Sequence, residues 1–163
     1  MSLFLILLAA GDSKRFKSST PKPYHVVNNK TVLEHSLNSF KGIKEIRQTV
    51  IVYNSKHKKY LSKLKIKNAI KIVGGKTRQQ STFAALKKIK KMNCSKVLIH
   101  DVARPNPSKK IIKKIIKKIK KNNAAVPIVK VNDAAKRFDK NSIFKNIKRE
   151  SLGFSQTPQG FKF

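Results

Sequence analysis

Apolar residues fall into short blocks along the chain, and small, polar or basic residues follow each block. The first block, from Leu3 to Leu8, reads L-F-L-I-L-L. Short apolar runs that end in Gly or polar residues are typical of buried strands, most often parallel ones. We therefore expect strands at Leu3–Leu8, at Gln48–Tyr53, at Ala69–Val73, at the start of Lys96–Pro105, and at Ala124–Val131.

Between these blocks the apolar residues recur at helical spacing. Thr31 and Glu34 have the spacing of a capping box, so a helix should begin at Val32. Further helices are expected at Lys56–Leu64, after the glycines of Gly74–Leu86, and at Ser108–Lys121. Strands that alternate with helices predict an α/β fold whose mostly parallel sheet is flanked by helices.

The stretch from Ser108 to Lys121 allows two interpretations. Its isoleucines form one stripe and lysines fill the remaining positions. A basic amphipathic helix of this kind can lie on a membrane surface. It can also be a crossover helix that covers the sheet, with Ser108 as N-cap. Its position between two predicted strands favours the crossover helix.

The region after the last predicted strand is more polar. Pro127 lies within Ala124–Val131 and indicates an edge strand or a bend. Residues 132–149 have weak periodicity and predict a hairpin arm that protrudes from the domain. No repeat and no linker divides the chain, so residues 1–163 are expected to form a single domain.

Composition narrows the class of protein. The single cysteine, Cys94, excludes an internal disulfide framework and a Cys-rich zinc site. The first apolar block is too short to span a membrane, and no charged segment typical of a signal peptide precedes it. We therefore expect a cytoplasmic protein without a membrane partner.

The net charge is +32, from 39 Lys and Arg against 7 Asp and Glu. Such a charge indicates polyanionic partners, and nucleic acid is one candidate. However, the lysines are spread along the chain, and aromatic residues are not interleaved with the basic runs as a stacking platform would need. A general bias of the source genome toward lysine explains the charge better than nucleic-acid binding does.

The loop after the first block, from Ala9 to Tyr24, is the first candidate site. Its small residues let a ligand approach the backbone closely, and Lys14, Arg15 and Lys22 bring three cations to one edge of the sheet. Such a loop suits a polyphosphate, although a solvated loop is the simpler alternative. The string A-A-G-D-S-K-R-F followed by P-K resembles the opening of nucleotidyltransferases that join a nucleoside triphosphate to a sugar or alditol phosphate.

Two later stretches carry further candidate groups. Arg78 and Ser81 lie on one face of a predicted first helical turn, where they can serve a base or a phosphate, or simply cap the helix. Asp101 and Arg104 follow a buried strand, at the edge where open α/β sheets bind ligands. The carboxylate of Asp101 suits a divalent metal or a ribose hydroxyl, and Arg104 suits a phosphate. His100 lacks the partners of a hydrolase, so we expect a structural role.

Five stretches in order then resemble one family. They are A-A-G-D-S-K-R-F with P-K, G-G-K-T-R-Q-Q-S, H-D-V-A-R-P, V-N-D-A-A-K-R and Q-T-P-Q-G-F. The set is similar to 2-C-methyl-D-erythritol 4-phosphate cytidylyltransferases of the non-mevalonate isoprenoid pathway. The resemblance implies a Rossmann-like nucleotidyltransferase fold, usually a homodimer, that couples CTP to methylerythritol phosphate and releases pyrophosphate with Mg²⁺.

The resemblance also implies roles for individual residues. Arg15 and Lys22 would be catalytic, holding the triphosphate and the transition state. Arg104, Arg149 and Thr157 would hold the phosphate of the acceptor, and Asp101 would hold the metal. The nucleotide would be bound by Ala9, Ala10, Gly11, Gly75, Arg78, Ser81 and Asp101. The arm at 132–149 would cross to the partner subunit.

The sequence departs from the family pattern in two places. Ala134 stands where the family usually has Thr, which removes one hydroxyl from the arm. The family also continues beyond the position of Phe163, so we expect the chain to lack a C-terminal part. The nearest alternative function is a ribitol 5-phosphate cytidylyltransferase, and a basic nucleic-acid-binding protein is a more remote one.

Overall fold

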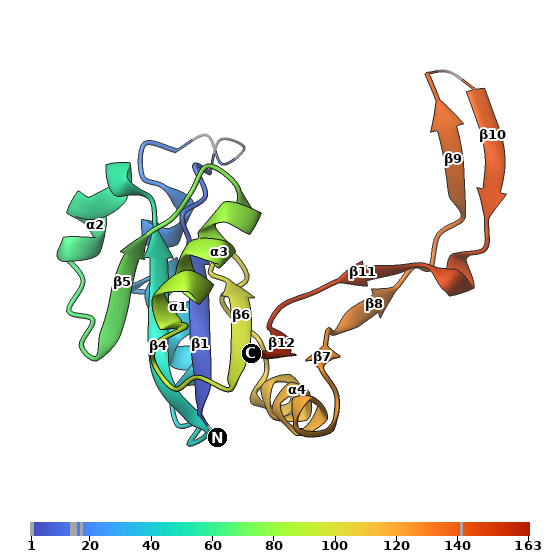
Figure 1. Cartoon of the computed structure of the whole chain (residues 1–163). Coiled ribbons are helices and arrows are strands. Elements are labelled where there is room, and N and C mark those ends of the chain that lie inside the picture. Colours follow the sequence, from blue (N-terminus) through green and yellow to red (C-terminus); the bar gives the residue numbers. More distant parts are fainter. Residues whose placement is uncertain (1, 14–15, 17, 141) are drawn as a thin grey trace.

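The computed structural model describes residues 2–13, 16, 18–140 and 142–163. Its centre is a six-stranded sheet in the order β5-β4-β1-β6-β12-β7. The strands of this sheet are β1 Leu3–Ala9, β4 Ile46–Tyr53, β5 Ala69–Val73, β6 Lys96–Asp101, β7 Ala124–Ala125 and β12 Gln159–Lys162. Strands β1, β4, β5 and β6 are parallel, and β12 runs antiparallel between β6 and β7. The predicted α/β class with a mostly parallel sheet is confirmed (Figure 1).

Strand β1 is apolar at every position, so its side chains form a hydrophobic core on each face of the sheet. Leu5 and Leu7 face a core that includes Leu33 of α1 and Ile112 of α4, whereas Ile6 faces a second core. The second core lies under α3, which contributes Ala85 and Ile89. The helices are α1 Val32–Phe40, α2 Lys58–Ser62, α3 Arg78–Ile89 and α4 Lys109–Lys121.

The helix starts follow the sequence signals. Thr31 forms the predicted capping box with Glu34, and Ser108 caps α4 by accepting the N–H of Ile111. Four isoleucines of α4 are buried and the fifth, Ile111, is partly buried against the same core, so its interpretation as a crossover helix is confirmed. Short 3-10 helices, η2 Lys22–Tyr24, η3 Ser55–His57 and η4 Arg149–Ser151, and the small hairpin of β2 Val26–Val27 and β3 Lys30–Thr31 complete the body and the base of the arm.

The prediction of a single strand over Ala124–Val131 is wrong. The chain forms β7 before Pro127 and a separate strand, β8 Ile128–Lys130, after it, and β8 pairs with β11 Gly153–Ser155 outside the main sheet. Pro127 has no N–H for a ladder, and its carbonyl accepts the N–H of Gln156 at 2.9 Å. The bend at this proline therefore directs the chain away from the body.

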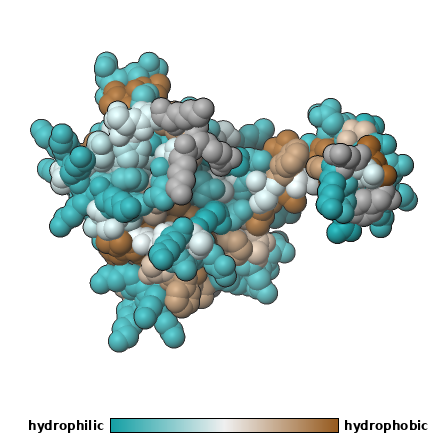
Figure 2. All heavy atoms as spheres, turned by 90° about the horizontal axis from the view of Figure 1, so that it is seen from above, coloured by the Kyte–Doolittle hydropathy of each residue, from teal (hydrophilic) through white to brown (hydrophobic). Residues whose placement is uncertain are grey.

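The hairpin predicted at 132–149 forms as β9 Ala135–Asp139 and β10 Ser142–Ile147. Together with β8 and β11 it makes an arm that extends far from the sheet (Figure 1). Figure 2 shows the arm standing apart from the body, with apolar surface along the link between them. Within residues 2–13, 16, 18–140 and 142–163, no helix is long and apolar enough to cross a membrane.

Candidate functional site

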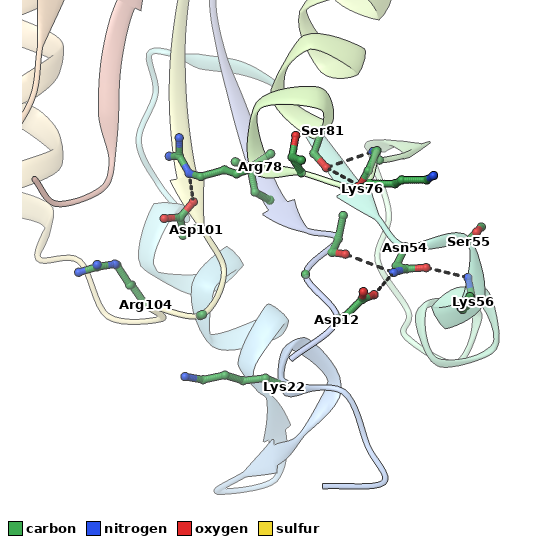
Figure 3. A pocket seen from close by; sticks show the side chains of 17 residues that line it. Asp12, Lys22, Asn54, Ser55, Lys56, Lys76, Arg78, Ser81, Asp101 and Arg104 are labelled. Carbon is green, nitrogen blue, oxygen red and sulfur yellow. Dashed lines mark hydrogen bonds and ion pairs between the residues drawn. The ribbon is translucent and has the colours of Figure 1, made fainter. Parts of the chain in front are cut away.

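A cavity of about 1120 Å³ opens at the carboxyl ends of β1, β4, β5 and β6 (Figure 3). This is the edge where an open α/β sheet binds ligands. Its described lining residues come from the first loop, the loops after β4, β5 and β6, and the start of α3: Leu8, Ala10, Gly11, Asp12, Lys22, Asn54, Ser55, Lys56, Gly74, Gly75, Lys76, Thr77, Arg78, Ser81, Asp101, Ala103 and Arg104.

Lys22 lies in the cavity wall and is held there by its own segment. Its backbone N–H donates to Ser13 Oγ at 3.1 Å. Two residues later, Tyr24 is buried and stacks on Tyr60 of α2, with ring centroids 5.5 Å apart. The same burial raises the pKa of Tyr24 to about 12, so this ring remains neutral. The η2 helix therefore anchors the backbone beneath the lysine.

Two predicted residues of the first loop are not seen in this wall. Arg15 lies outside the described residues. The side chain of Ala9 is buried in the core on the opposite face from Ala10, because neighbouring residues of an extended chain point to opposite faces. Ala10 and Gly11 line the cavity as expected.

Asn54, which the sequence analysis overlooked, joins two loops. Its Nδ2 donates to Ala10 O at 3.3 Å and to Asp12 Oδ1 at 2.6 Å, and its Oδ1 accepts the N–H of Lys56. Asn54 follows directly after the predicted strand Gln48–Tyr53, so its position at a carboxyl end was the signal that pointed to it. The lysines at 56 and 76 gave no such signal in a lysine-rich chain.

The junction after β5 brings Ser81 against the glycine turn. Ser81 Oγ accepts the N–H of Gly75 at 3.2 Å. A Cβ on Gly74 would lie 2.6 Å from Ala10 Cβ and 2.7 Å from Ser81 Oγ, so only glycine fits there. Among the described glycines, a positive φ is found at Gly42 and not at Gly74 or Gly75. The glycines serve close packing between the first loop and α3.

Arg78 and Asp101 meet across the cavity. Arg78 Nε donates to Asp101 Oδ1 at 3.0 Å, and its Nη2 donates to Gln159 Oε1 at 3.4 Å. The pair is partly exposed, with 49% and 29% of the two side chains accessible. A ligand entering the cavity can therefore reach both members of the pair.

His100 is fully buried and joins β6 to the turn before β12. Its Nε2 donates to Arg104 O at 2.9 Å, and its Nδ1 accepts from Thr157 Oγ1 at 2.9 Å. Burial, more than the neighbouring charges, lowers the pKa of His100 to about 4, so the neutral ring that this pattern needs is the stable form. The hydroxyl of Thr157 therefore donates its proton to His100. Thr157 is not among the residues that line the cavity of this chain.

Two predicted phosphate-binding residues are far apart in the chain. Arg104 lines the cavity, and its Nη1 donates to Gln156 Oε1. Arg149 lies at the base of the arm, where its Nη1 donates to Asn132 O at 2.8 Å and its Nε lies 3.3 Å from Glu150. A single chain does not bring these two arginines together.

The charge of the cavity suits a polyanion. Among the described lining residues, cations outnumber carboxylates: the cations are Lys22, Lys56, Lys76, Arg78 and Arg104, and the carboxylates are Asp12 and Asp101. No group of three His, Cys, Asp or Glu side chains that could cage a metal occurs in the described part of the chain. Mg²⁺ commonly takes one or two carboxylates and completes its shell with water and ligand phosphates, so Asp101 still fits such an ion.

Comparison with known proteins gives consistent results. The family model for "IspD: 2-C-methyl-D-erythritol 4-phosphate cytidylyltransferase" matches residues 3–163. The bifunctional enzyme IspD/IspF of Pelagibacter ubique is 44% identical over the whole chain, which covers 44% of that protein. The 2-C-methyl-D-erythritol 4-phosphate cytidylyltransferase of Shouchella clausii is 33% identical over the whole chain, which covers 72% of it.

Solved structures agree with the fold. The 4-diphosphocytidyl-2C-methyl-D-erythritol synthase of Anaerococcus prevotii matches with a TM-score of 0.81 at 29% identity, over 99% of this chain and 71% of that one. The bifunctional IspDF of Campylobacter jejuni has a TM-score of 0.81 at 26% identity, over 99% of this chain and 41% of that one. The chain spans less than half the length of the bifunctional IspD/IspF enzymes of Pelagibacter ubique and Paramagnetospirillum magneticum, 44% and 42%.

Proposed function

Because this chain belongs to the 2-C-methyl-D-erythritol 4-phosphate cytidylyltransferase family, we propose that its cavity transfers a cytidylyl group from CTP to 2-C-methyl-D-erythritol 4-phosphate. The products would be 4-diphosphocytidyl-2-C-methyl-D-erythritol and pyrophosphate. The observation that carries the proposal is the cation-rich cavity at the carboxyl edge of the sheet, within a chain that the family model matches from residue 3 to 163.

The reaction joins two anions. An oxygen of the acceptor phosphate attacks the α-phosphorus of CTP, a new P–O bond forms, and the bond to the β-phosphate breaks. The attacking oxygen is already ionised, so no side chain has to remove a proton. Repulsion is the main obstacle, and fixed cations that face the developing charge lower it.

We assign the cations by their position. Lys22, in the anchored wall of the first loop, would face the triphosphate. Arg104, on the β6 side, would face the acceptor phosphate. Arg15 keeps the catalytic role that the family resemblance implies, and the turn of Gly75 with Ser81 would hold the cytidine end.

Asp101 is the carboxylate that we expect to hold Mg²⁺, with Asp12 as the second carboxylate in the cavity. Magnesium bound with CTP would neutralise part of the triphosphate charge. Arg78, which now pairs with Asp101, would then be released toward an anionic group of the nucleotide.

We further propose that the enzyme is a homodimer of the cytoplasm, joined through the arm. Phe138 and Ile143 face each other across β9 and β10, and 69% and 65% of their surfaces are exposed. Such a cross-strand apolar pair needs a cover, and a second copy would supply it. If the arm of each subunit packs on the other subunit, it would also bring Arg149 and residues around Ala134 to the partner's cavity.

CTP selectivity tests the proposed nucleotide. A ligand that binds the folded state raises the melting temperature by mass action. We expect CTP with Mg²⁺ to raise the melting temperature of this chain more than ATP or GTP does at equal concentration. Equal shifts from all three nucleotides would contradict the cytidine assignment.

The acceptor is tested by pyrophosphate release with methylerythritol phosphate and with ribitol 5-phosphate. The curated relatives named above carry the methylerythritol name or the bifunctional IspD/IspF name, which does not favour ribitol. Faster release with ribitol 5-phosphate would overturn the choice of acceptor. DNA that competes with CTP for the cavity would point instead to the nucleic-acid alternative.

A further inference from the structure

The four-residue turn from Gln156 to Gln159 contacts three residues at the β6 side of the cavity. Gln156 accepts from Arg104, Thr157 donates to His100, and Gln159 accepts from Arg78. These contacts come from a segment more than 50 residues away along the chain from Arg104 and His100. One turn therefore reaches both Arg78 and Arg104, the arginines among the described cavity residues.

Each glutamine is oriented by its own amide nitrogen. Gln156 Nε2 donates to Phe154 O at 3.3 Å, and Gln159 Nε2 donates to Ser155 Oγ at 2.9 Å. With the nitrogen held on the turn side, each amide oxygen is left facing a guanidinium group. Both side chains thus use the donor and the acceptor that an amide offers.

An amide oxygen and a carboxylate both orient an arginine, but they differ in the charge that they leave on it. A carboxylate orients a guanidinium but cancels its charge, as Asp101 does for Arg78. An amide oxygen orients the group and leaves its full positive charge for a ligand. Arg104 has no carboxylate partner among the described ion pairs, so its charge remains available to an anion.

The turn itself is fixed to the body. The N–H of Gln156 donates to Pro127 O, and Gln159 begins β12, which pairs antiparallel with β6 from Ile99 back to Lys96. Thr157 Oγ1 also accepts the N–H of Asp101 at 3.4 Å. The two amide oxygens are therefore held in place by backbone on both sides of the turn.

We propose that Gln156 and Gln159 are positioning residues that orient Arg104 and Arg78 without adding a negative charge, so that Arg104 keeps its full charge and Arg78 is neutralised by Asp101 alone. Gln156 acts on the acceptor-phosphate side of the cavity and Gln159 on the nucleotide side. The consequence for ligand binding rests on the proposed function, whereas the ordering of the two guanidinium groups does not.

The ordering is tested by NMR of the arginine side chains in the 163-residue chain. A guanidinium whose Nη group is held rotates slowly and gives separated Nη signals, whereas a free one gives averaged signals. We expect Gln156→Ala to average the signals of Arg104 and leave Arg78 unchanged, and Gln159→Ala to do the reverse. Gln48→Ala is the matched control, because Gln48 also makes two side-chain hydrogen bonds but lies away from the cavity. Unchanged signals in both turn variants would overturn the inference.

The charge argument is tested by Gln156→Glu. A carboxylate at this position keeps Arg104 ordered but neutralises it, and losing a charge-assisted contact of about 1.5 kcal/mol weakens binding about tenfold. Calorimetry should therefore show about tenfold weaker binding of methylerythritol phosphate in the presence of CTP, with the Kd of CTP itself changed less than about twofold. Wild-type affinity for the sugar phosphate in Gln156→Glu would overturn the proposed role. If the unaltered chain binds neither ligand, the proposed function fails, and the NMR result still decides the ordering.

Discussion

The body of the sheet and the arm differ in what covers their apolar side chains. In the body, Leu5, Ile6 and Leu98 are buried by helices and strands of the same chain. In the arm, Phe138, Ile143 and Phe154 remain exposed although they lie in paired strands. Hydrogen-bonded pairing alone therefore gives the arm its shape but no core.

The body and the arm are therefore stabilised by different interactions. The body is stabilised by apolar burial, which is the dominant favourable term in folding. A two-stranded hairpin without such burial is marginal in water, so the arm depends on something outside its own strands. The following changes test that division, beginning with the largest expected effect.

Leu98→Ala should lower the free energy of unfolding by about 2–5 kcal/mol, because it leaves a cavity in a fully buried part of the sheet. Phe138→Ser in the arm should change the stability of the monomer by less than about 0.5 kcal/mol. Urea unfolding of dilute protein measures both. Similar losses in the two variants would mean that the arm packs on its own chain.

Lys22→Ala should lower turnover about a hundred- to a thousandfold, the usual cost of removing one preorganised electrostatic group. Arg15→Ala should do the same, because a planar fork and a point charge do not replace each other. The fold should survive, as circular dichroism can verify. Lys114→Ala on the exposed face of α4 is the control and should change little. Equal losses in the control would assign the effect to general positive charge.

Acid should weaken the body through His100. Its pKa is lowered from 6.5 to about 4 in the folded state, so the unfolded chain binds more protons between these values and stability falls as the pH falls. The contribution is fully present above pH 6.5, and about 3 kcal/mol is lost by pH 4. Unfolding of His100→Asn across this range should show a shallower pH dependence than the unaltered chain. Identical slopes would show that another group causes the acid sensitivity.

Replacing both Phe138 and Ile143 by Ser should raise the Kd of the proposed dimer by more than about 100-fold, because burial of each such side chain is worth about 1.5–3 kcal/mol and every subunit loses two of them. Analytical ultracentrifugation at several concentrations measures the change. A chain that is monomeric at micromolar concentration and fully active would contradict an interface through the arm.

The sequence predicted those elements whose pattern is local. β1 and β6 are continuous apolar runs, and α1 carries its capping box within four residues. β12 was missed because its sequence, Q-G-F-K, has little pattern of its own. Its place is set by α4, where a Cβ on Gly160 would lie 2.7 Å from Ile115 and 2.9 Å from Ile119.

The residues of the site also fall into those that a local sequence pattern predicts and those that depend on distant contacts. Asp101 and Arg104 were predicted because they follow a buried strand, and both line the cavity. The roles of Gln156 and Gln159 depend on partners that no local spacing reveals. Arg149 was assigned to the same phosphate as Arg104, yet a single chain keeps the two apart, so that assignment depends on a second copy.

The antiparallel strand β12 lies between β6 and β7, although it comes later in the chain than either neighbour. During synthesis on the ribosome, the parallel strands and their helices emerge first and can pack as they appear. The edge of β6 stays unpaired until residues 159–162 have emerged, and β7 has no partner in the main sheet before then. The turn that contacts Arg104 and Arg78 directly precedes β12 and emerges together with it. A chain released before the turn and β12 are made would therefore have an open edge at β6, and Arg104 and Arg78 would lack their glutamine partners.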